Sequence, residues 1–302
     1  MAIDEATTNN VGIADRTSGT GRRPVIIIGM HRSGTSMLSQ ALEAAGLFLG
    51  WRQLPEHQEA QFFLRLNMWV MLQTSAGWET PESVRYLLDR PQAREAVVEY
   101  LRFALRSPRA MSYLGPVRYG RHRSVERLDE PWGWKDPRTT FTLPLWLDIF
   151  PNAKIVHVVR HGVDVAASLR VRQRTIERDS LDRFRRQRRH HLFRTKLSEL
   201  TPGLRFESLE EGLSLWERYT REASQAVTRL GERALELRYE DFLASPAQCI
   251  DDLAEFCGLD DTSKAVAAVA HVDADRAFAY RESPELRAFA EQNADRLGAR
   301  GY

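Results

Sequence analysis

Residues 25–39 read VIIIGMHRSGTSMLS. The first four residues are apolar and β-branched, which predicts a short buried strand. They run directly into a loop that contains Gly29 and Gly34, and the residues after Gly34 have the apolar spacing of a helix. The stretch therefore predicts a strand, a tight loop and the start of a helix.

A loop of this kind forms a binding site for an oxyanion such as phosphate or sulfate. Glycines let successive backbone N–H groups point inward, and the N-terminal end of the helix adds partial positive charge. The Walker-A pattern G-x-x-x-x-G-K-[ST] matches at Gly29, Gly34 and Ser36, but Thr35 stands at the lysine position. This disfavours an ATPase or GTPase and leaves Arg32 as the basic group. An ordinary strand–helix turn with incidental glycines is the alternative.

The composition favours one large globular unit. The chain has 302 residues, of which 43% are hydrophobic, enough for a sizeable core. We expect a flexible tail at residues 1–20, which are polar, and a single domain at 21–302. Cys249 and Cys257 lack a CxxC pattern, and no apolar run approaches the ~18 residues that cross a bilayer. We therefore expect a cytoplasmic protein with no zinc site and no transmembrane segment. The oligomeric state is not readable.

Alternating strand and helix patterns predict the fold class. Apolar spacing predicts helices near 56–73, 82–89 and 92–106, a helical cover at about 54–106 over the mouth of the loop. Residues 107–130, rich in Arg, Ser, Gly and Pro, predict irregular surface. Strands near 132–136, 155–160 and 234–239, with helices after them, predict a three-layer α/β sandwich. Its parallel central sheet has about four or five strands, a P-loop-like strand–loop–helix and helical insertions.

A second motif follows the strand near 155–160. Arg160 ends this strand, and Ser168 lies eight positions later on the next helix. Ligands of open α/β sheets bind outside the carboxyl ends of strands, where Arg160 offers a planar fork to a phosphate and Ser168 donates beside it. Together with the loop, this suits a nucleotide phosphorylated at two places. Alternatively, Arg160 pairs with a surface carboxylate and Ser168 is an ordinary helix residue.

The two motifs together resemble those of the PAPS-dependent sulfotransferase family, most closely its bacterial and carbohydrate branches. In that family a basic residue before S-G-T receives the 5′-phosphosulfate, matched by RSGTS at 32–36. Its 3′-phosphate motif is matched by Arg160, the DVA at 164–166 and Ser168. WKDPR at 134–138 and YEDF at 239–242 resemble further segments, in family order. A counterpart of the family's C-terminal Gly-rich loop is not found at 298–301, which leaves the adenine contacts open.

The resemblance implies the reaction and its residues. The sulfuryl group of 3′-phosphoadenosine 5′-phosphosulfate (PAPS) passes in line to a hydroxyl or amine of a small-molecule, glycan or lipid acceptor, releasing PAP, without a metal. Arg32 and Lys135 stabilise the leaving oxygen, although Lys135 alternatively forms a strand-end salt bridge with Asp136 or another residue. The implied donor-binding residues are Arg32, Ser33, Gly34, Thr35, Ser36, Arg160 and Ser168.

A base must take the proton of the acceptor. Glycan-type members of the family often use a glutamate after the first helix, and Glu59 is the first choice here. His57 is second, because imidazole titrates near neutral pH, and Glu56 is third. A solvated charged face at a helix start is the alternative for each.

An arginine-rich segment stands apart from the rest of the chain. Residues 170–196 contain ten arginines, one lysine and three acids, a net charge of +8 that leaves −6 for the rest of a chain with a total of +2. We favour a partly mobile flap at about 170–198 that grips an anion at the site. A nucleic-acid or membrane surface and a solvated helix are the alternatives. Aromatic residues do not interleave the arginines, so no stable nucleic-acid partner is expected. The rival functions are a P-loop small-molecule kinase and a noncatalytic nucleic-acid binder.

Overall fold

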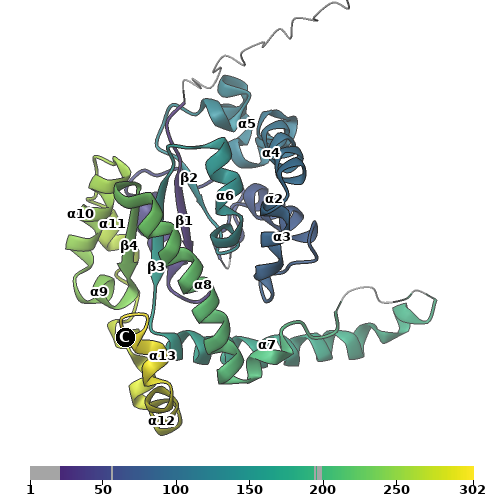
Figure 1. The fold of residues 1–302 in the computed structure, drawn as a ribbon, viewed down its shortest axis with the longest axis vertical. Helices are drawn as coiled ribbons and strands as arrows, with labels where there is room; N and C mark the ends of the chain where they lie inside the picture. Colours follow the sequence, from purple (N-terminus) through teal and green to yellow (C-terminus); the bar gives the residue numbers. More distant parts are fainter. Residues whose placement is uncertain (1–20, 56, 194, 196–198) are drawn as a thin grey trace, which may run out of the picture.

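The computed structural model describes residues 21–55, 57–193, 195 and 199–302. The expected tail at 1–20, Glu56 and part of the expected flap lie outside the described residues. Buried apolar segments form one parallel sheet, as expected, from the strands β1 (Val25–Gly29), β2 (Gly133–Lys135), β3 (Lys154–Val159) and β4 (Ala234–Arg238). Their order is β2-β1-β3-β4 (Figure 1). The predicted α/β class with a parallel sheet is confirmed.

The register of the sheet brings the ends of three strands together. Ile27 of β1 pairs with Lys135 on one side and with Val156 on the other, and Gly29 pairs with Val158. All pairings are parallel, so the residues that follow β1, β2 and β3 emerge at one edge. This edge carries the glycine loop, Lys135 and Arg160.

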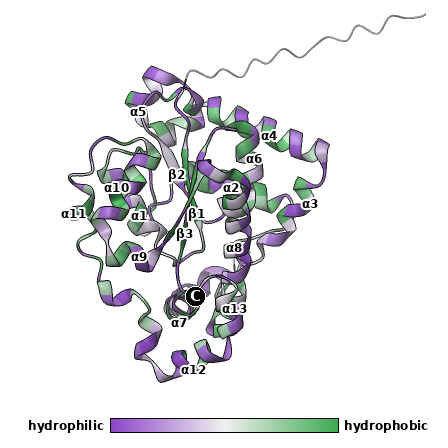
Figure 2. Cartoon of the chain, turned by 60° about the vertical axis from the view of Figure 1, so that its left-hand side comes forward, coloured by the Kyte–Doolittle hydropathy of each residue, from purple (hydrophilic) through white to green (hydrophobic). Residues whose placement is uncertain are grey.

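One face of the sheet is covered by helices from both ends of the chain. Side chains of Val25, Ile27, Val156 and Val158 point to this face, because alternate residues of a strand point to opposite sides. The helices on this face, seen beside the sheet in Figure 2, are α1 (Thr35–Ala44), α9 (Tyr239–Ala244), α10 (Pro246–Cys257) and α11 (Ala265–Val269).

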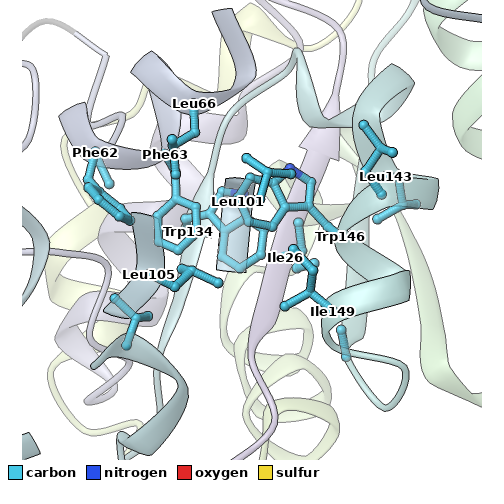
Figure 3. Close-up of a cluster of buried hydrophobic side chains, with 14 of the residues drawn as sticks. Ile26, Phe62, Phe63, Leu66, Leu101, Leu105, Trp134, Leu143, Trp146 and Ile149 are labelled. Atoms are coloured by element: carbon cyan, nitrogen blue, oxygen red, sulfur yellow. The ribbon is translucent and has the colours of Figure 1, made fainter. Parts of the chain in front are cut away.

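The opposite face holds the larger core. Figure 3 shows Phe63, Trp134 and Trp146 packed over Ile26, and the rings of Phe63 and Trp134 stack with centroids 4.0 Å apart. The helices that supply this layer are α2 (Gln61–Leu72), α4 (Pro91–Arg106), α5 (Met111–His122), α6 (Thr139–Ile149) and α8 (Leu209–Leu230). The molecule is therefore a three-layer sandwich.

One expectation about the middle of the chain needs correction, that of irregular surface at residues 107–130. The predicted helical cover at 54–106 forms α2, the short helices η1 (Pro81–Val84) and α3 (Arg85–Leu88), and α4. Residues of α2 and α4 pack in the core on a face of the sheet, while His57 and Glu59, which precede α2, line a cavity with the glycine loop. Residues 107–130 are not irregular surface. They form α5, because Gly115, with φ 71°, permits a kink before Pro116 and the buried Tyr113 and Leu114 anchor it in the core.

The arginine-rich segment belongs mostly to α7 (Gly162–Gln187), which starts at the carboxyl end of β3 and projects from the body (Figure 1). Helices α12 (Pro284–Gln292) and α13 (Ala294–Gly298) lie near the beginning of α7. None of the helices within the described parts of the chain has the length and apolar character to cross a membrane. The remaining elements are short 3-10 turns at Pro108–Ala110, Val125–Arg127, Arg188–His191, Leu204–Glu207, Gly231–Arg233, Ala274–Arg276 and Ala279–Glu282.

Candidate active site

A cavity of about 250 Å³ lies at the edge where β1, β2 and β3 end. The glycine loop lines it with Arg32, Gly34, Thr35 and Ser36. Arg160 lines the same cavity from the end of β3. Arg160 therefore faces the same space as the glycine loop, whereas Ser33 and Ser168, also predicted to bind the donor, are not among the described residues that line it.

The loop has the backbone shape that an oxyanion site needs. Gly34 has φ 97° and precedes α1, whose start has no side-chain cap among the described residues. A Cβ atom at Gly34 would lie 2.3 Å from a ring carbon of Tyr239, so a residue larger than glycine does not fit here unless its surroundings shift. Arg32, with φ 71°, is held in the left-handed region. Ser33 turns inward instead, and its hydroxyl donates to the Met30 carbonyl at 2.6 Å.

Arg32 and Ser168 are in direct contact. The Nε of Arg32 donates to the Ser168 Oγ at 2.9 Å. From the sequence we expected Ser168 to act beside Arg160. In the structure the Ser168 Oγ accepts a hydrogen bond from Arg32 of the glycine loop. The contact ties the glycine loop to the first turns of α7.

Arg160 is a buried arginine with an unused donor. Its side chain is only 8% exposed, so it is not part of a surface ion pair. One guanidinium nitrogen donates to the Arg276 carbonyl at 2.8 Å and lies 3.5 Å from Asp164. The guanidinium also lies over the ring of Tyr239, 4.6 Å from its centroid. Its Nε has no hydrogen-bond partner within the described residues. A buried N–H of this kind is satisfied when an anion binds.

Lys135 bridges the glycine loop and the candidate bases. It is 2% exposed, and its Nζ lies 3.4 Å from the Ser36 Oγ and 3.6 Å from a carboxylate oxygen of Glu59. It also donates to the His57 carbonyl. Burial lowers the pKa of Lys135, and the carboxylate of Glu59 opposes this shift. The ion partner of Lys135 is thus Glu59 rather than Asp136.

Glu59 precedes α2 and is buried, with 4% exposure, so it does not belong to a solvated face. Its two oxygens lie 3.6 Å from the Lys135 Nζ and 3.5 Å from an Arg138 nitrogen. His57 lines the same cavity. Glu56, the third candidate base, lies outside the described residues.

Arg138 is a site residue to which the sequence reasoning gave no role. It lies 3.1 Å from Asp136, which accepts from Asn67 at 2.9 Å. Asn67 is fully buried, and its side-chain Oδ1 accepts from the Thr142 hydroxyl and the Trp146 Nε1. Burial raises the pKa of Asp136, and Arg138 opposes this shift. Arg138 is the last residue of the WKDPR segment. Its contact with Asp136, which Asn67 holds in turn, orients its side chain.

His31 was missed although it lies within the loop. It lines the cavity, and its Nε2 has no hydrogen-bond partner among the residues described. Burial lowers the pKa of His31 well below its usual value, and the charges of Arg138 and Arg172 act in the same direction. The imidazole is therefore neutral at neutral pH.

A C-terminal segment that sequence reasoning overlooked completes the cavity. His271, Val272 and Arg276 line it. Of the expected flap, Arg172 lines the cavity. The remainder of the described flap residues is not part of this lining.

The cavity is strongly electropositive. Glu59 is the one carboxylate among the described residues that line it. The cations of the lining are Arg32, Lys135, Arg138, Arg160, Arg172 and Arg276. This arrangement suits a ligand with several negative charges. Within the described ranges, no group of three or more His, Cys, Asp or Glu side chains is arranged to hold a metal ion.

Comparisons with known proteins give a family match and a relative of low identity. A family profile described as "Sulfotransferase family" matches residues 24–263. An uncharacterized protein of Aquifex aeolicus (strain VF5) is 28% identical over 167 residues, which cover 52% of this chain and 18% of that protein. The match thus spans less than a fifth of that relative's length.

Two solved structures are similar at low identity. The sulfotransferase domain from the curacin biosynthetic pathway is 16% identical, with 91% of this chain and 98% of that chain covered and a TM-score of 0.46. A sulfotransferase from Alicyclobacillus acidocaldarius is 21% identical, with 92% and 95% covered and a TM-score of 0.44.

Proposed function

This chain belongs to the sulfotransferase family, and we propose that it transfers a sulfuryl group from PAPS to a hydroxyl or amine of an acceptor, releasing PAP. The observation that carries the proposal is the shared cavity of the glycine loop and Arg160. One adenosine with phosphate groups at both ends would satisfy both motifs.

The donor's two charged ends are assigned to separate residues. The 5′-phosphosulfate binds at the backbone N–H groups of Gly34, Thr35 and Ser36 and at Arg32. The 3′-phosphate binds at Arg160, whose buried Nε lacks a partner among the described residues. Ser168 supports this end, because its oxygen accepts from Arg32 and its hydroxyl proton remains available to a phosphate.

The adenosine is assigned to the C-terminal side of the cavity. Val272 and Tyr239 offer apolar surface there, and Arg276 adds a cation. The backbone of Arg276 is already tied to Arg160. Val272 and Arg276 would thus contact the adenine, for which the sequence predicted no binding residues.

Transfer requires positioning and charge stabilisation. The acceptor oxygen forms a bond to sulfur while the bond from sulfur to the bridging phosphate oxygen breaks. Arg32 and Lys135 neutralise the charge that develops on the bridging oxygen. Glu59, oriented by Lys135 and Arg138, takes the proton of the acceptor. Arg32, Lys135 and Arg138 supply the positive charge, and the proposed reaction uses no metal ion.

Ligand-dependent melting and sulfate transfer test this function. We expect PAP at about 100 times its dissociation constant to stabilise the fold by about 2.7 kcal/mol, and radiolabelled sulfate from PAPS to appear on an acceptor. A shift with magnesium-ATP or magnesium-GTP and none with PAP would instead assign a kinase. Strongly salt-dependent RNA or DNA binding without a nucleotide shift would assign a nucleic-acid binder.

A further inference from the structure

The far end of α7 has no part in the proposed reaction. The helix reaches the active site near its beginning, where Arg172 lines the cavity. It continues to Gln187 and is followed by the 3-10 turn Arg188–His191. This part projects from the body of the molecule in Figure 1. We call residues 183–193, which end just after the turn, the basic tip.

The basic tip concentrates positive charge. Its eleven residues include five arginines and no aspartate or glutamate. All five arginines are exposed, at positions 183, 185, 186, 188 and 189. Arg185 lies 3.2 Å from Asp182, and an ion pair in contact with water stabilises a fold little. The tip therefore presents a cluster of positive charge to its surroundings.

The chain outside the arginine-rich segment has the opposite net charge. Residues 170–196 sum to +8, which leaves −6 for the other residues. A negatively charged surface therefore attracts the arginine-rich helix and repels the rest of the molecule. Such a surface would orient the protein with the basic tip toward it.

Two large apolar side chains lie at the end of the basic tip. Leu192 is 73% exposed, and Phe193 is 95% exposed, the highest fraction of the large apolar side chains that the structure describes. The rings of Phe184 and His191 stack with centroids 6.1 Å apart, which ties the 3-10 turn to α7. Exposed apolar side chains beside a cluster of arginines are typical of a segment that lies at the surface of a membrane.

A bilayer with anionic lipids matches both features of the basic tip. Its headgroup phosphates bind arginines, and the boundary with the acyl chains takes up apolar side chains. A nucleic acid also offers phosphates, but it has no apolar layer for Leu192. A bilayer needs no matching pocket, and the projection of the tip in Figure 1 lets a flat surface reach it.

We propose that the basic tip binds the surface of a bilayer that contains anionic lipids. The arginines contact the headgroup phosphates, and Leu192 and Phe193 insert at the boundary with the acyl chains. This inference goes beyond the proposed function, since it assigns a place where the protein acts and no step of sulfate transfer. At a helix rise of about 1.5 Å per residue, Arg172 lies about 17 Å before the tip, so the bilayer contact leaves the donor site open.

Co-sedimentation with lipid vesicles tests the proposal. The full chain is mixed with vesicles of phosphatidylcholine alone, or with mixed vesicles of phosphatidylcholine and phosphatidylglycerol in equal amounts. The tip variants are Phe193→Ser and the double variant Arg186→Gln with Arg189→Gln. Because these positions are exposed, the variants should fold like the wild type, which melting curves verify.

Matched controls change the same residue types outside the tip. Phe103→Ser alters a phenylalanine of α4 that is 62% exposed. Arg65→Gln with Arg127→Gln removes two exposed arginines, one from α2 and one from the turn Val125–Arg127. Binding of a duplex DNA tests the nucleic-acid alternative, and titration with PAP reports on the donor site.

We expect the wild type to bind the mixed vesicles, and to bind phosphatidylcholine alone about tenfold more weakly. Loss of Arg186 and Arg189 should weaken binding to the mixed vesicles about thirtyfold, and Phe193→Ser about tenfold, because less apolar surface inserts. High salt should weaken this binding as well, since it screens the arginines. The control variants should bind like the wild type, and every variant should keep its affinity for PAP.

Three results would overturn the proposal. One is equal affinity of the wild type for the two kinds of vesicle. Another is unchanged binding of both tip variants to the mixed vesicles. The third is binding of the wild type to duplex DNA but not to the mixed vesicles, which would assign the tip to a nucleic acid. The vesicle assay contains no PAPS, so its outcome does not depend on the proposed function.

Discussion

The Nε of Arg32 and the Oγ of Ser168 lie 2.9 Å apart, although 136 positions separate the two residues. This hydrogen bond joins the glycine loop after β1 to α7 after β3. It orients the arginine that we propose binds the phosphosulfate, and in the same proposal the serine hydroxyl donates to the 3′-phosphate. This hydrogen bond therefore links the two segments that form the proposed donor site.

Ser168→Ala should weaken PAP binding. The variant removes the acceptor of Arg32 Nε and one donor to the ligand, a loss of about 1 to 2 kcal/mol. Ser180→Ala, on α7 outside the cavity lining, is the control and should bind PAP normally. Equal PAP affinities of both variants in calorimetry would remove Ser168 from the site.

Gly34→Ala should abolish most PAP binding. Its Cβ would approach the Tyr239 ring to 2.3 Å, so the ring or the loop must shift. Gly46→Ala is a matched control, since Gly46 also has φ 97° but has no heavy atom within 4 Å of the new Cβ. Both variants carry the left-handed strain of about 1 kcal/mol. Thermal melting and PAP titration should separate them, and equal PAP affinities would show that the approach to Tyr239 is unimportant.

Glu59→Gln should retain PAP binding and lose turnover. The amide keeps the shape of the side chain but cannot take the acceptor's proton, which lowers kcat by about 10²–10⁴-fold. The measurement is sulfate transfer at saturating PAPS, with PAP affinity as the control. Normal turnover would transfer the role of base to His57 or Glu56.

His161 should make the fold acid-sensitive. Burial, and then the charges of Arg281 and Arg160, lower the pKa of His161 to about 4 from its usual 6.5. Between these pH values the unfolded chain binds a proton that the folded chain does not. The free energy of unfolding should therefore fall as the pH drops from 6.5 toward 4, by on the order of 3 kcal/mol in total.

His161→Phe isolates this contribution. Phenylalanine keeps a ring against Tyr280, on which His161 stacks with centroids 4.2 Å apart, but does not titrate. Urea unfolding at several pH values should show a shallower loss of stability in the variant than in the wild type. Parallel curves would contradict the assignment of the shift to His161.

Local sequence patterns predicted the parallel sheet and the position of the glycine loop. Val25 to Gly29 are buried together, and Arg160 follows a buried strand, as the runs of apolar residues predicted. The sandwich and the approach of the two motifs follow from strand order, because β1 and β3 are neighbours. The prediction of irregular surface at 107–130 was wrong. Gly115 and Pro116 usually interrupt a helix, but burial of Tyr113 stabilises α5 in spite of them.

The rest of the site depends on tertiary packing. His271 and Arg276 reach the cavity only because the segment after α11 folds back over α7. Arg172 was one of many arginines in a basic run, and nothing in that run distinguishes the residue that faces Trp78. The orientation of Arg138 depends on Asp136, two positions away, and on Asn67, which is distant in sequence and holds Asp136.

The most direct test of the central claim compares PAP with AMP, which lacks the 3′-phosphate, on the wild type and Arg160→Ala. Arg170→Ala is the control, because Arg170 pairs with Glu285 and does not line the cavity. We predict that Arg160→Ala weakens PAP by about 1.5–3 kcal/mol and leaves AMP affinity nearly unchanged, as expected for a charge-assisted contact to the 3′-phosphate. Equal loss for both nucleotides, or no loss for either, would contradict a single donor held at both ends.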